Sequence, residues 1–259
     1  MIQSFYSAAS GLNAQQKNID VMANNVANIN TTGYKQQRLD FKDALNVRMR
    51  NPVENGDHMN LQLGTGAIPL QVNRIFHQGV ALDTGRALDF MIEGRGFFTI
   101  RGYDAEGDEI ELYTRDGTFY VDAEGQLTDS AGRFVLDTNG DIIVIEDPAR
   151  TQVTQEGMFL FPDEEGNLVE SDIRLRIVDF MNPVGLIVTG DNLFMESENS
   201  GDVEEMEIPN VVSGYLEGSN VDYALETTRL IRAQRAYQFA SRALSVADQM
   251  AGLANSIRQ

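Results

Sequence analysis

Apolar side chains recur every seven residues at both ends of this 259-residue chain, and this repeat constrains the fold most. A sustained heptad repeat indicates long helices that supercoil around partner helices. Near the start of the chain, the repeat and its companion positions comprise Phe5, Leu12, Ile19, Met22 and Val26. Near the end, the matching set comprises Phe239, Val246, Met250, Leu253 and Ile257.

The C-terminal heptad lies beside a second apolar stripe. With side chains placed at 100° steps, the two stripes cover roughly 200° of the helix, about twice the arc of an ordinary surface helix. The N-terminal helix covers about half of such an arc, so we expect the rest to pack against other molecules. The alternative is a buried helix of a monomeric bundle, but the pattern provides no third long helix. The second stripe contains Leu230, Ala233, Tyr237, Ala240, Leu244 and Ala247.

The sequence predicts an α+β fold in which long N- and C-terminal helices form a coiled-coil-like domain around a central all-β domain. The helices are expected over 4–29 and 222–257, within a terminal assembly domain of residues 1–30 and 219–259. The first helix is predicted to stop in the run Asn28 to Gly33. The second is predicted to start at a capping box, with Ser219 followed three residues later by Asp222.

The middle of the chain divides into two parts by pattern. Residues 31–68 read as an irregular connecting segment, and residues 69–218 as a β-rich outer domain with short strand-like runs at 97–100, 118–121, 141–145 and 175–178. An Asp-x-x-Gly pattern repeats between such runs and suits type I turns that return the chain as hairpins. The alternative, calcium loops, lacks the EF-hand spacing. The pattern starts at Asp104, Asp122, Asp129, Asp137 and Asp163.

Composition excludes several functions. The net charge is -19, of which residues 41–218 hold -22, so nucleic acid is not expected as a partner. The chain has no cysteine and two histidines, and no glycine-rich segment continues into a phosphate-binding motif. We therefore predict no enzyme activity, cofactor, metal or small-molecule substrate, with an acidic carbohydrate hydrolase as the weakest alternative. The start of the chain does not read as a cleaved signal, so export is expected by another route.

Three stretches resemble the signatures of bacterial flagellar rod and hook proteins, and together they span essentially the whole chain. They are residues 10–35, 82–98 and 219–237. Length favours a rod protein over a hook protein, and residues 61–66 and 73–79 are most similar to distal rod proteins. Residues 47–60 and Ala240-Ser241-Arg242 depart from that pattern, so a proximal rod paralogue stays open. The motif residues are Asn24, Asn25, Asn28, Gly33, Tyr34, Gln234 and Arg235.

The resemblance implies a structural subunit of the flagellar basal-body rod. Such proteins are exported by the flagellar type III apparatus and polymerise through their terminal helices into a tube that transmits torque from motor to hook. The implied partners are further copies of the chain, other rod proteins, the hook protein and the surrounding basal-body rings. A secreted coiled-coil binding module, or adhesin, that displays a β domain is the alternative from another class.

Overall fold

The computed structural model describes residues 2–44, 47–49, 61–63, 66–103, 107–148, 150–163, 168–206 and 208–257. The chain divides into two compact units. We call residues 1–27, 37–74 and 222–259 the helical unit, and residues 28–36 and 75–221 the β unit. Each unit is described by itself below.

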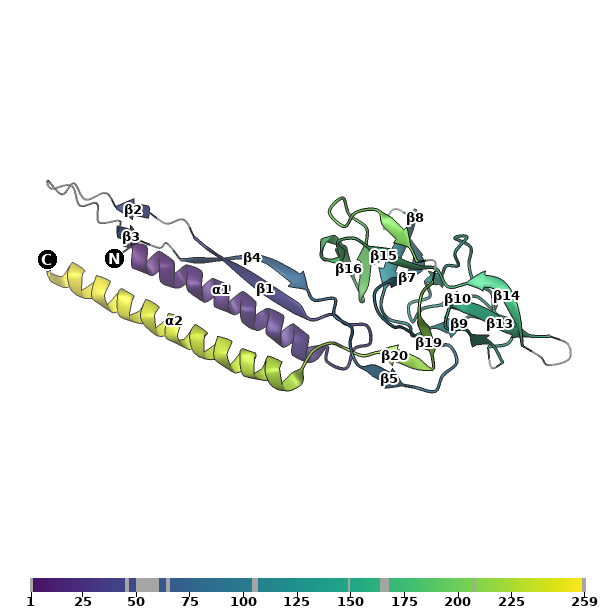
Figure 1. Ribbon diagram of the computed structural model, residues 1–259. Coiled ribbons are helices and arrows are strands. Elements are labelled where there is room, and N and C mark those ends of the chain that lie inside the picture. The colour runs from purple at the N-terminus through teal and green to yellow at the C-terminus, as the bar shows by residue number, and fades with distance from the viewer. Residues whose placement is uncertain are drawn as a thin grey trace. The chain divides into compact units, whose positions relative to one another are not determined.

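Two long helices run antiparallel in the helical unit and pack along each other (Figure 1). Helix α1 spans Ile2–Ala27 and helix α2 spans Tyr223–Ile257. The predicted capping box is wrong in its register, because the carboxylate of Asp222 itself accepts the Leu225 N–H at 3.0 Å as the N-cap of α2. The Ser219 hydroxyl instead accepts the nearby Val221 N–H. In the part of the chain that the structure describes, neither helix has the length and apolarity needed to cross a bilayer.

A β-hairpin packs along α1 in the same unit. Its strands β1 (Gln37–Asp43) and β4 (Ala67–Arg74) are antiparallel, and the short strands β2 (Val47–Met49) and β3 (Leu61–Leu63) pair with each other. The expectation of an irregular segment over 31–68 therefore fails at these strands. The run from Arg38 to Lys42 alternates polar and apolar residues, which is a short strand signal that the prediction missed. In the structure only Leu39 of this strand is buried. Residues 50–60 of the expected insertion lie outside the described residues.

The β unit is built from one large antiparallel sheet and three smaller ones (Figure 1). The large sheet has the order β16-β17-β8-β7-β11-β10-β9, and β15 pairs with both β7 and β18. Its strands are β7 (Phe97–Tyr103), β8 (Glu109–Thr114), β9 (Tyr120–Val121), β10 (Leu127–Thr128), β11 (Phe134–Val135), β15 (Ile177–Phe180), β16 (Ile187–Gly190), β17 (Leu193–Met195) and β18 (Val203–Glu205).

The smaller sheets have two or three strands each. One contains β12 (Gln152–Val153), β13 (Met158–Pro162) and β14 (Leu168–Arg174). The other two pair β6 (Phe90–Ile92) with β19 (Val211–Ser213), and β5 (Ala81–Asp83) with β20 (Tyr215–Glu217). A short 3-10 helix, η1, spans Pro183–Gly185.

Strand β7 is buried on both faces and separates two apolar cores. Successive side chains of a strand point to opposite faces, so Phe98 and Ile100 enter the larger core while Phe97 enters the smaller one. In the smaller core the Phe97 ring packs edge-to-face against Phe194 and Phe180 at centroid distances of 5.6 and 5.8 Å. The sequence expectation of a strand over 97–100 is confirmed.

Three of the five Asp-x-x-Gly repeats form the predicted turns. In each, the glycine N–H donates to the aspartate carbonyl at 3.0–3.2 Å and the glycine has a φ of 83–86°. The turn at Asp129 joins β10 to β11, and the one at Asp122 joins β9 to β10. Aspartate carboxylates also accept turn N–H groups, as Asp137 does from Asn139 at 2.9 Å. The repeats at Asp104 and Asp163 lie partly outside the described residues.

The predicted strand over 141–145 is not a strand in the structure. Its backbone bonds are divided between two neighbouring hairpins, with isolated bridges at Leu136–Ile142 and Gln126–Val144. The Ile145 N–H donates to Gly125, whereas Ile143 donates to Val135. Ile143 and Ile145 are nevertheless buried in the larger core, which explains their apolar character. The α+β class is confirmed, while coiled-coil packing stays a prediction.

Candidate assembly surface

The two predicted stripes of α2 have different environments in the single chain. The second stripe faces inward: Ala233 is buried at 4 %, while Leu230, Tyr237 and Leu244 are half-buried. α1 is the element that packs along α2 and provides this cover. The heptad stripe stays exposed, at 67 % for Phe239, 52 % for Val246, 51 % for Met250 and 63 % for Leu253. The side chain of Ile257 lies outside the described residues.

The predicted positions of α1 are only partly covered. Leu12, Ile19, Met22 and Val26 are half-buried, and Phe5 is 44 % exposed. The positions buried most deeply on this helix are instead Ala14 and Asn25. A single chain therefore leaves apolar surface uncovered on both helices. Among the family-motif residues, Asn24, Gln234 and Arg235 are exposed, Asn28 is half-buried, and Asn25, Gly33 and Tyr34 are buried.

Asn25 links three elements of the helical unit. Its amide nitrogen donates to Glu226 Oε1 at 2.7 Å and to the carbonyl of Gln37 at 2.8 Å, and its amide oxygen accepts the Gln37 N–H at 2.8 Å. Glu226 is 2 % exposed and also pairs with Arg229 at 3.2 Å. One buried amide thus joins α1 to β1 and to α2. Asn25 is one of the motif residues, whereas Glu226 was not predicted. In the sequence, Glu226 is only an acidic residue beside an apolar stripe.

Gly33 is required by a close backbone approach within the β unit. Its φ is +66°, a conformation that L side chains rarely adopt. A Cβ at this position would lie 2.6 Å from the backbone nitrogen of Asp116. Its N–H donates to the carbonyl of Glu217 at 2.7 Å. The glycine of the motif therefore lets the segment that follows α1 pack directly against the backbone at Asp116.

The β1–β4 hairpin exposes apolar side chains that were not among the predicted site residues. Ile68, Leu70 and Val72 of β4 are 47–61 % exposed, and Phe41 of β1 is 44 % exposed. Val72 lies opposite Leu39 and Ile68 lies opposite Lys42, with an irregular register between them, so these side chains are divided between the two faces of the ribbon. Apolar side chains grouped on one exposed ribbon are typical of a surface that another surface covers.

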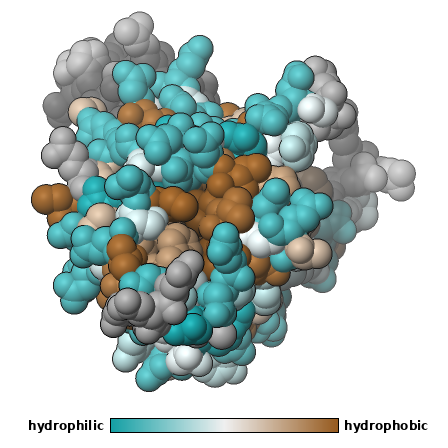
Figure 2. All heavy atoms as spheres, turned by 90° about the vertical axis from the view of Figure 1, so that its right-hand side faces the viewer, coloured by the Kyte–Doolittle hydropathy of each residue, from teal (hydrophilic) through white to brown (hydrophobic). Residues whose placement is uncertain are grey.

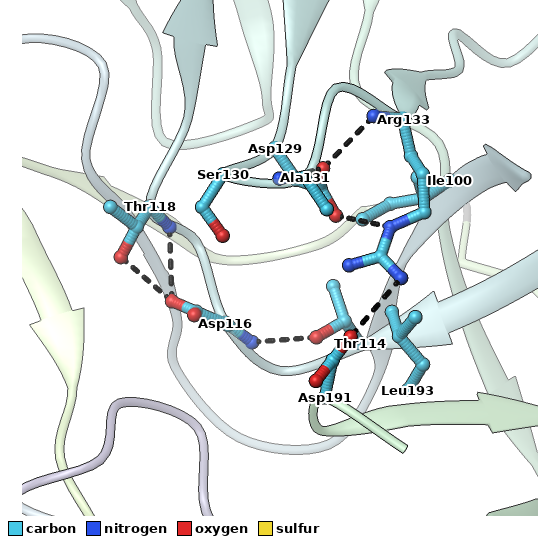
Figure 3. Close-up of a pocket in the computed structure, with 10 residues that line it drawn as sticks. All are labelled: Ile100, Thr114, Asp116, Thr118, Asp129, Ser130, Ala131, Arg133, Asp191 and Leu193. Atoms are coloured by element: carbon cyan, nitrogen blue, oxygen red, sulfur yellow. Dashed lines mark hydrogen bonds and ion pairs between the residues drawn. The ribbon is translucent and has the colours of Figure 1, made fainter. Parts of the chain in front are cut away.

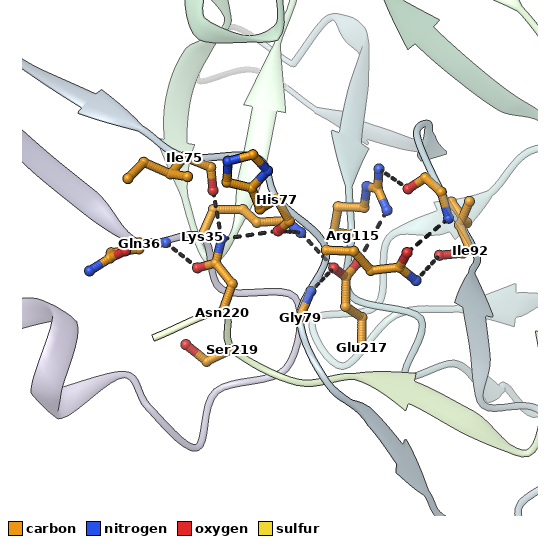
Figure 4. A network of polar contacts seen from close by, with 12 residues as sticks. Lys35, Gln36, Ile75, His77, Gly79, Ile92, Arg115, Glu217, Ser219 and Asn220 are labelled. Carbon is orange, nitrogen blue, oxygen red and sulfur yellow. Dashed lines mark hydrogen bonds and ion pairs between the residues drawn. The ribbon is translucent and has the colours of Figure 1, made fainter. Parts of the chain in front are cut away.

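A buried charge network lies where three segments of the β unit meet (Figure 4). The carboxylate of Glu217 pairs with Lys35 Nζ at 2.6 Å and with Arg115 Nη1 at 3.2 Å. All three side chains are at most 4 % exposed. Burial lowers the pKa of Lys35 and of Arg115, and the attraction of Glu217 opposes this effect in both. None of these three residues was among the predicted site residues, although Lys35 is the last residue of the N-terminal motif stretch 10–35.

A polar hollow of about 240 Å³ lies at the turn between β10 and β11 (Figure 3). Its charged side chains mostly satisfy one another: Asp129 pairs with Arg133 at 2.6 Å, and Asp116 accepts the Thr118 hydroxyl at 2.7 Å. Burial raises the pKa of the Asp116 carboxyl, although hydrogen bonds from Thr118 and Thr32 oppose the shift. Within the described residues no group of three or more potential metal-binding side chains comes together.

The end of the β unit that carries β13 and β14 has apolar side chains in the middle of a largely hydrophilic face (Figure 2). A hollow of about 410 Å³ on this unit is lined by Val144, Phe161, Pro162 and Ile173, with Glu146 and Asp147 beside them. Phe161 stacks parallel to the buried Phe159 ring at 6.2 Å, which anchors it to the larger core. The hollow is therefore a shallow extension of that core.

Three family models match the chain, and all describe flagellar proteins. The flagella basal body rod protein model matches residues 5–35, the flagellar hook protein FlgE/F/G D1 domain model matches residues 91–161, and the flagellar basal body rod FlgEFG protein C-terminal model matches residues 212–257. Terminal helices that pair in one unit, a separate β unit and family matches in both units define a structural protein of the flagellar axis.

Sequence similarity to named proteins identifies the family within this class. The flagellar basal-body rod protein FlgG of Borreliella burgdorferi is 36 % identical over 272 residues that cover 100 % of both chains. FlgG of Bacillus subtilis is 34 % identical over 96 % of this chain and 97 % of the relative, and the flagellar hook-basal body complex protein FlhP of the same organism is 32 % identical over 100 % of both. The chain belongs to the flagellar basal-body rod protein family.

Family membership confirms the resemblance found in the sequence. The protein is a structural rod subunit of the flagellar basal body, and it assembles with other rod and hook components. The adhesin alternative is not favoured by any of these matches.

Proposed function

We propose that the protein polymerises through its terminal helices into the tubular wall of the rod. The observation that carries this proposal is the exposed heptad stripe of α2, since Phe239, Val246, Met250 and Leu253 are each more than half exposed in the single chain. A contiguous apolar stripe on a soluble subunit is costly unless another surface covers it. In the proposed polymer, helices of neighbouring copies provide that cover in a coiled-coil-like contact.

The contact is proposed to be heterologous. Two of the uncovered apolar surfaces of the helical unit differ in structure, since one is the α2 stripe and the other is the exposed apolar side chains of the β1–β4 hairpin. An interface that joins unlike surfaces repeats without closing on itself and produces a helical filament. Torque from the motor to the hook would then pass from copy to copy along the wall.

The proposed partners beyond the rod follow from family membership and charge. Export by the flagellar type III apparatus is proposed on membership alone. The middle of the chain, residues 41–218, is proposed to face the surrounding basal-body rings, and it carries a net charge of -22. A strongly anionic outer wall would resist adhesion to acidic neighbours during rotation.

The proposal is tested by making the α2 stripe polar. The double variant Phe239→Ser with Leu253→Ser is compared with a matched control, Gln238→Ser with Gln249→Ser, which changes exposed polar positions of the same helix. We expect the stripe variant to be absent from isolated basal bodies and the control to be present. Equal helix content by circular dichroism shows that both variants fold. Incorporation of the stripe variant at the wild-type level contradicts the proposal. A wild-type protein that forms a small closed oligomer and no tubes contradicts it as well.

A further inference from the structure

Three segments of the β unit lead to the helical unit, and all three meet at one place (Figure 4). Residues 28–36 follow α1, residues 75–80 follow β4, and residues 217–221 precede α2. We call these the connecting segments. Every force that passes along the backbone between the two units must cross them.

Glu217 bonds to the other two connecting segments with its side chain and its backbone. Its Oε1 accepts from Lys35 Nζ at 2.6 Å and from the Gly79 N–H at 2.8 Å. Its backbone carbonyl accepts the Gly33 N–H at 2.7 Å. Its Oε2 accepts from Arg115 Nη1 at 3.2 Å, which ties the group to the segment that follows β8.

Asn220 joins the same three segments a second time. Its amide nitrogen donates to the carbonyl of Ile75 at 2.7 Å and to that of His77 at 3.0 Å. Its amide oxygen accepts the Gln36 N–H at 2.7 Å. The backbones also come very close, since a Cβ at Gly79 would lie 1.9 Å from the carbonyl oxygen of Gly218.

The chemistry of this cluster makes it cooperative. Two buried cations share one buried carboxylate, so removing the carboxylate takes away the ion-pair partner of both cations at once. Lys35 Nζ also donates to the His77 carbonyl at 3.0 Å, and Arg115 Nη2 donates to the Gly94 carbonyl at 2.8 Å. Each cation is therefore positioned by backbone groups as well as by Glu217. Loss of one member is expected to release its neighbours.

We propose that Glu217 and Asn220 form a junction clasp that closes the three connecting segments into one cooperative element, distinct in stability from the two apolar cores. The clasp takes groups from the segment that follows α1, the segment that follows β4 and the segment that precedes α2. Its mechanical meaning rests on the proposed function: a rod subunit whose three connecting segments are cross-linked shares torque among them, whereas unlinked segments act as independent tethers.

Hydrogen exchange followed by mass spectrometry on the soluble full-length monomer tests the clasp. The amides of Gly33, Gln36 and Gly79 report it directly, since each donates to Glu217 or Asn220. Glu217→Gln keeps the shape and removes the charge. We expect exchange at least about tenfold faster in all three connecting segments together, with β7 and β8 unchanged. The matched control, Glu204→Gln on an exposed position of β18, is expected to change none of them.

The remaining outcomes also decide the proposal. Faster exchange confined to residues 217–221 would show three independent contacts and overturn it. Faster exchange throughout the β unit would show that Glu217 supports the core and would overturn it as well. If Glu217→Gln does not fold, Asn220→Ala gives the same three-segment readout without creating an unpaired buried charge. Because the measurement uses the monomer, its result is independent of whether the chain polymerises.

Discussion

Asn25 Nδ2 of α1 lies 2.7 Å from Glu226 Oε1 of α2, although the two residues are 201 positions apart in the sequence. Both side chains are almost completely buried, at 0 % and 2 % exposure. The bond fixes the longitudinal register of α1 against α2, because no other spacing of the helices brings the two groups together. It also explains in physical terms why an asparagine stands at this place in the N-terminal motif.

Replacing Asn25 tests this register bond. Asn25→Ala removes the hydrogen bond to Glu226 Oε1 and those to both backbone groups of Gln37, so we expect a loss of about 1–3 kcal/mol in the free energy of unfolding. Urea unfolding followed by circular dichroism at 222 nm measures it. The control is Asn13→Ala at an exposed position of the same helix, for which we expect a change within about 0.5 kcal/mol. Equal free energies of unfolding for the two variants would show that the hydrogen bonds of Asn25 do not stabilise the fold.

The contact face of α2 is tested by enlarging a small side chain. Ala233 is 4 % exposed, so Ala233→Leu must displace atoms of the packed helices and should cost about 1–3 kcal/mol of stability. Ala243→Leu makes the same change at an exposed position and should be nearly neutral, because leucine is almost as good a helix former as alanine. Thermal unfolding of the two variants compares them. A lower melting temperature for Ala243→Leu than for Ala233→Leu would show that Ala233 does not lie on the face of α2 that packs in the helical unit.

Gly33 and Gly132 separate backbone strain from steric overlap. Both have positive φ, but a Cβ at Gly33 would lie 2.6 Å from the Asp116 nitrogen, whereas Gly132 has no heavy atom within 4 Å of that position. Gly132→Ala should cost about 1–2 kcal/mol from strain alone. Gly33→Ala should cost more, since backbone must also move. Chemical denaturation of both variants ranks them, and an equal cost would mean that the approach to Asp116 relaxes freely.

Asp116 makes stability depend on pH. Burial raises its pKa in the folded protein above its ordinary value of 3.8, so the folded state binds more protons than the unfolded state between pH 3.8 and the raised pKa. The contribution of Asp116 to stability therefore falls as pH rises through that window. Asp116→Asn keeps an oxygen acceptor for Thr118 and removes the charge. We expect Asp116→Asn to be more stable than wild type at pH 7.

The same comparison at low pH supplies the control. Below pH 3.8 the carboxyl is protonated in both states, so the difference between wild type and Asp116→Asn should shrink. Urea titrations at pH 7 and pH 3 give the two values. A difference that stays constant between them would show that the hydrogen bonds of the side chain, and not its charge, decide the effect.

The sequence alone predicted the elements that depend on local pattern. Apolar residues at helical spacing marked α1 and α2 to within two residues at each end. The turns at Asp122, Asp129 and Asp137 were found because an aspartate and a glycine at fixed spacing suit one turn type. The heptad also separated the two faces of α2, one of which α1 covers while Phe239 and Val246 stay exposed. In each case the information lies within a few neighbouring residues.

Tertiary structure decided what depends on distant partners. The β1 strand carries only two apolar residues, Leu39 and Phe41, and is completed by pairing with β4, while residues 141–145 look like a strand but divide their bonds between two hairpins. The junction of Lys35 with Glu217 joins positions 182 residues apart, and neither residue shows in its own neighbourhood that it is buried. A local pattern specifies helices, turns and apolar faces because it sets backbone preference and amphipathicity. The partner of a buried charge is set only when the chain folds back on itself.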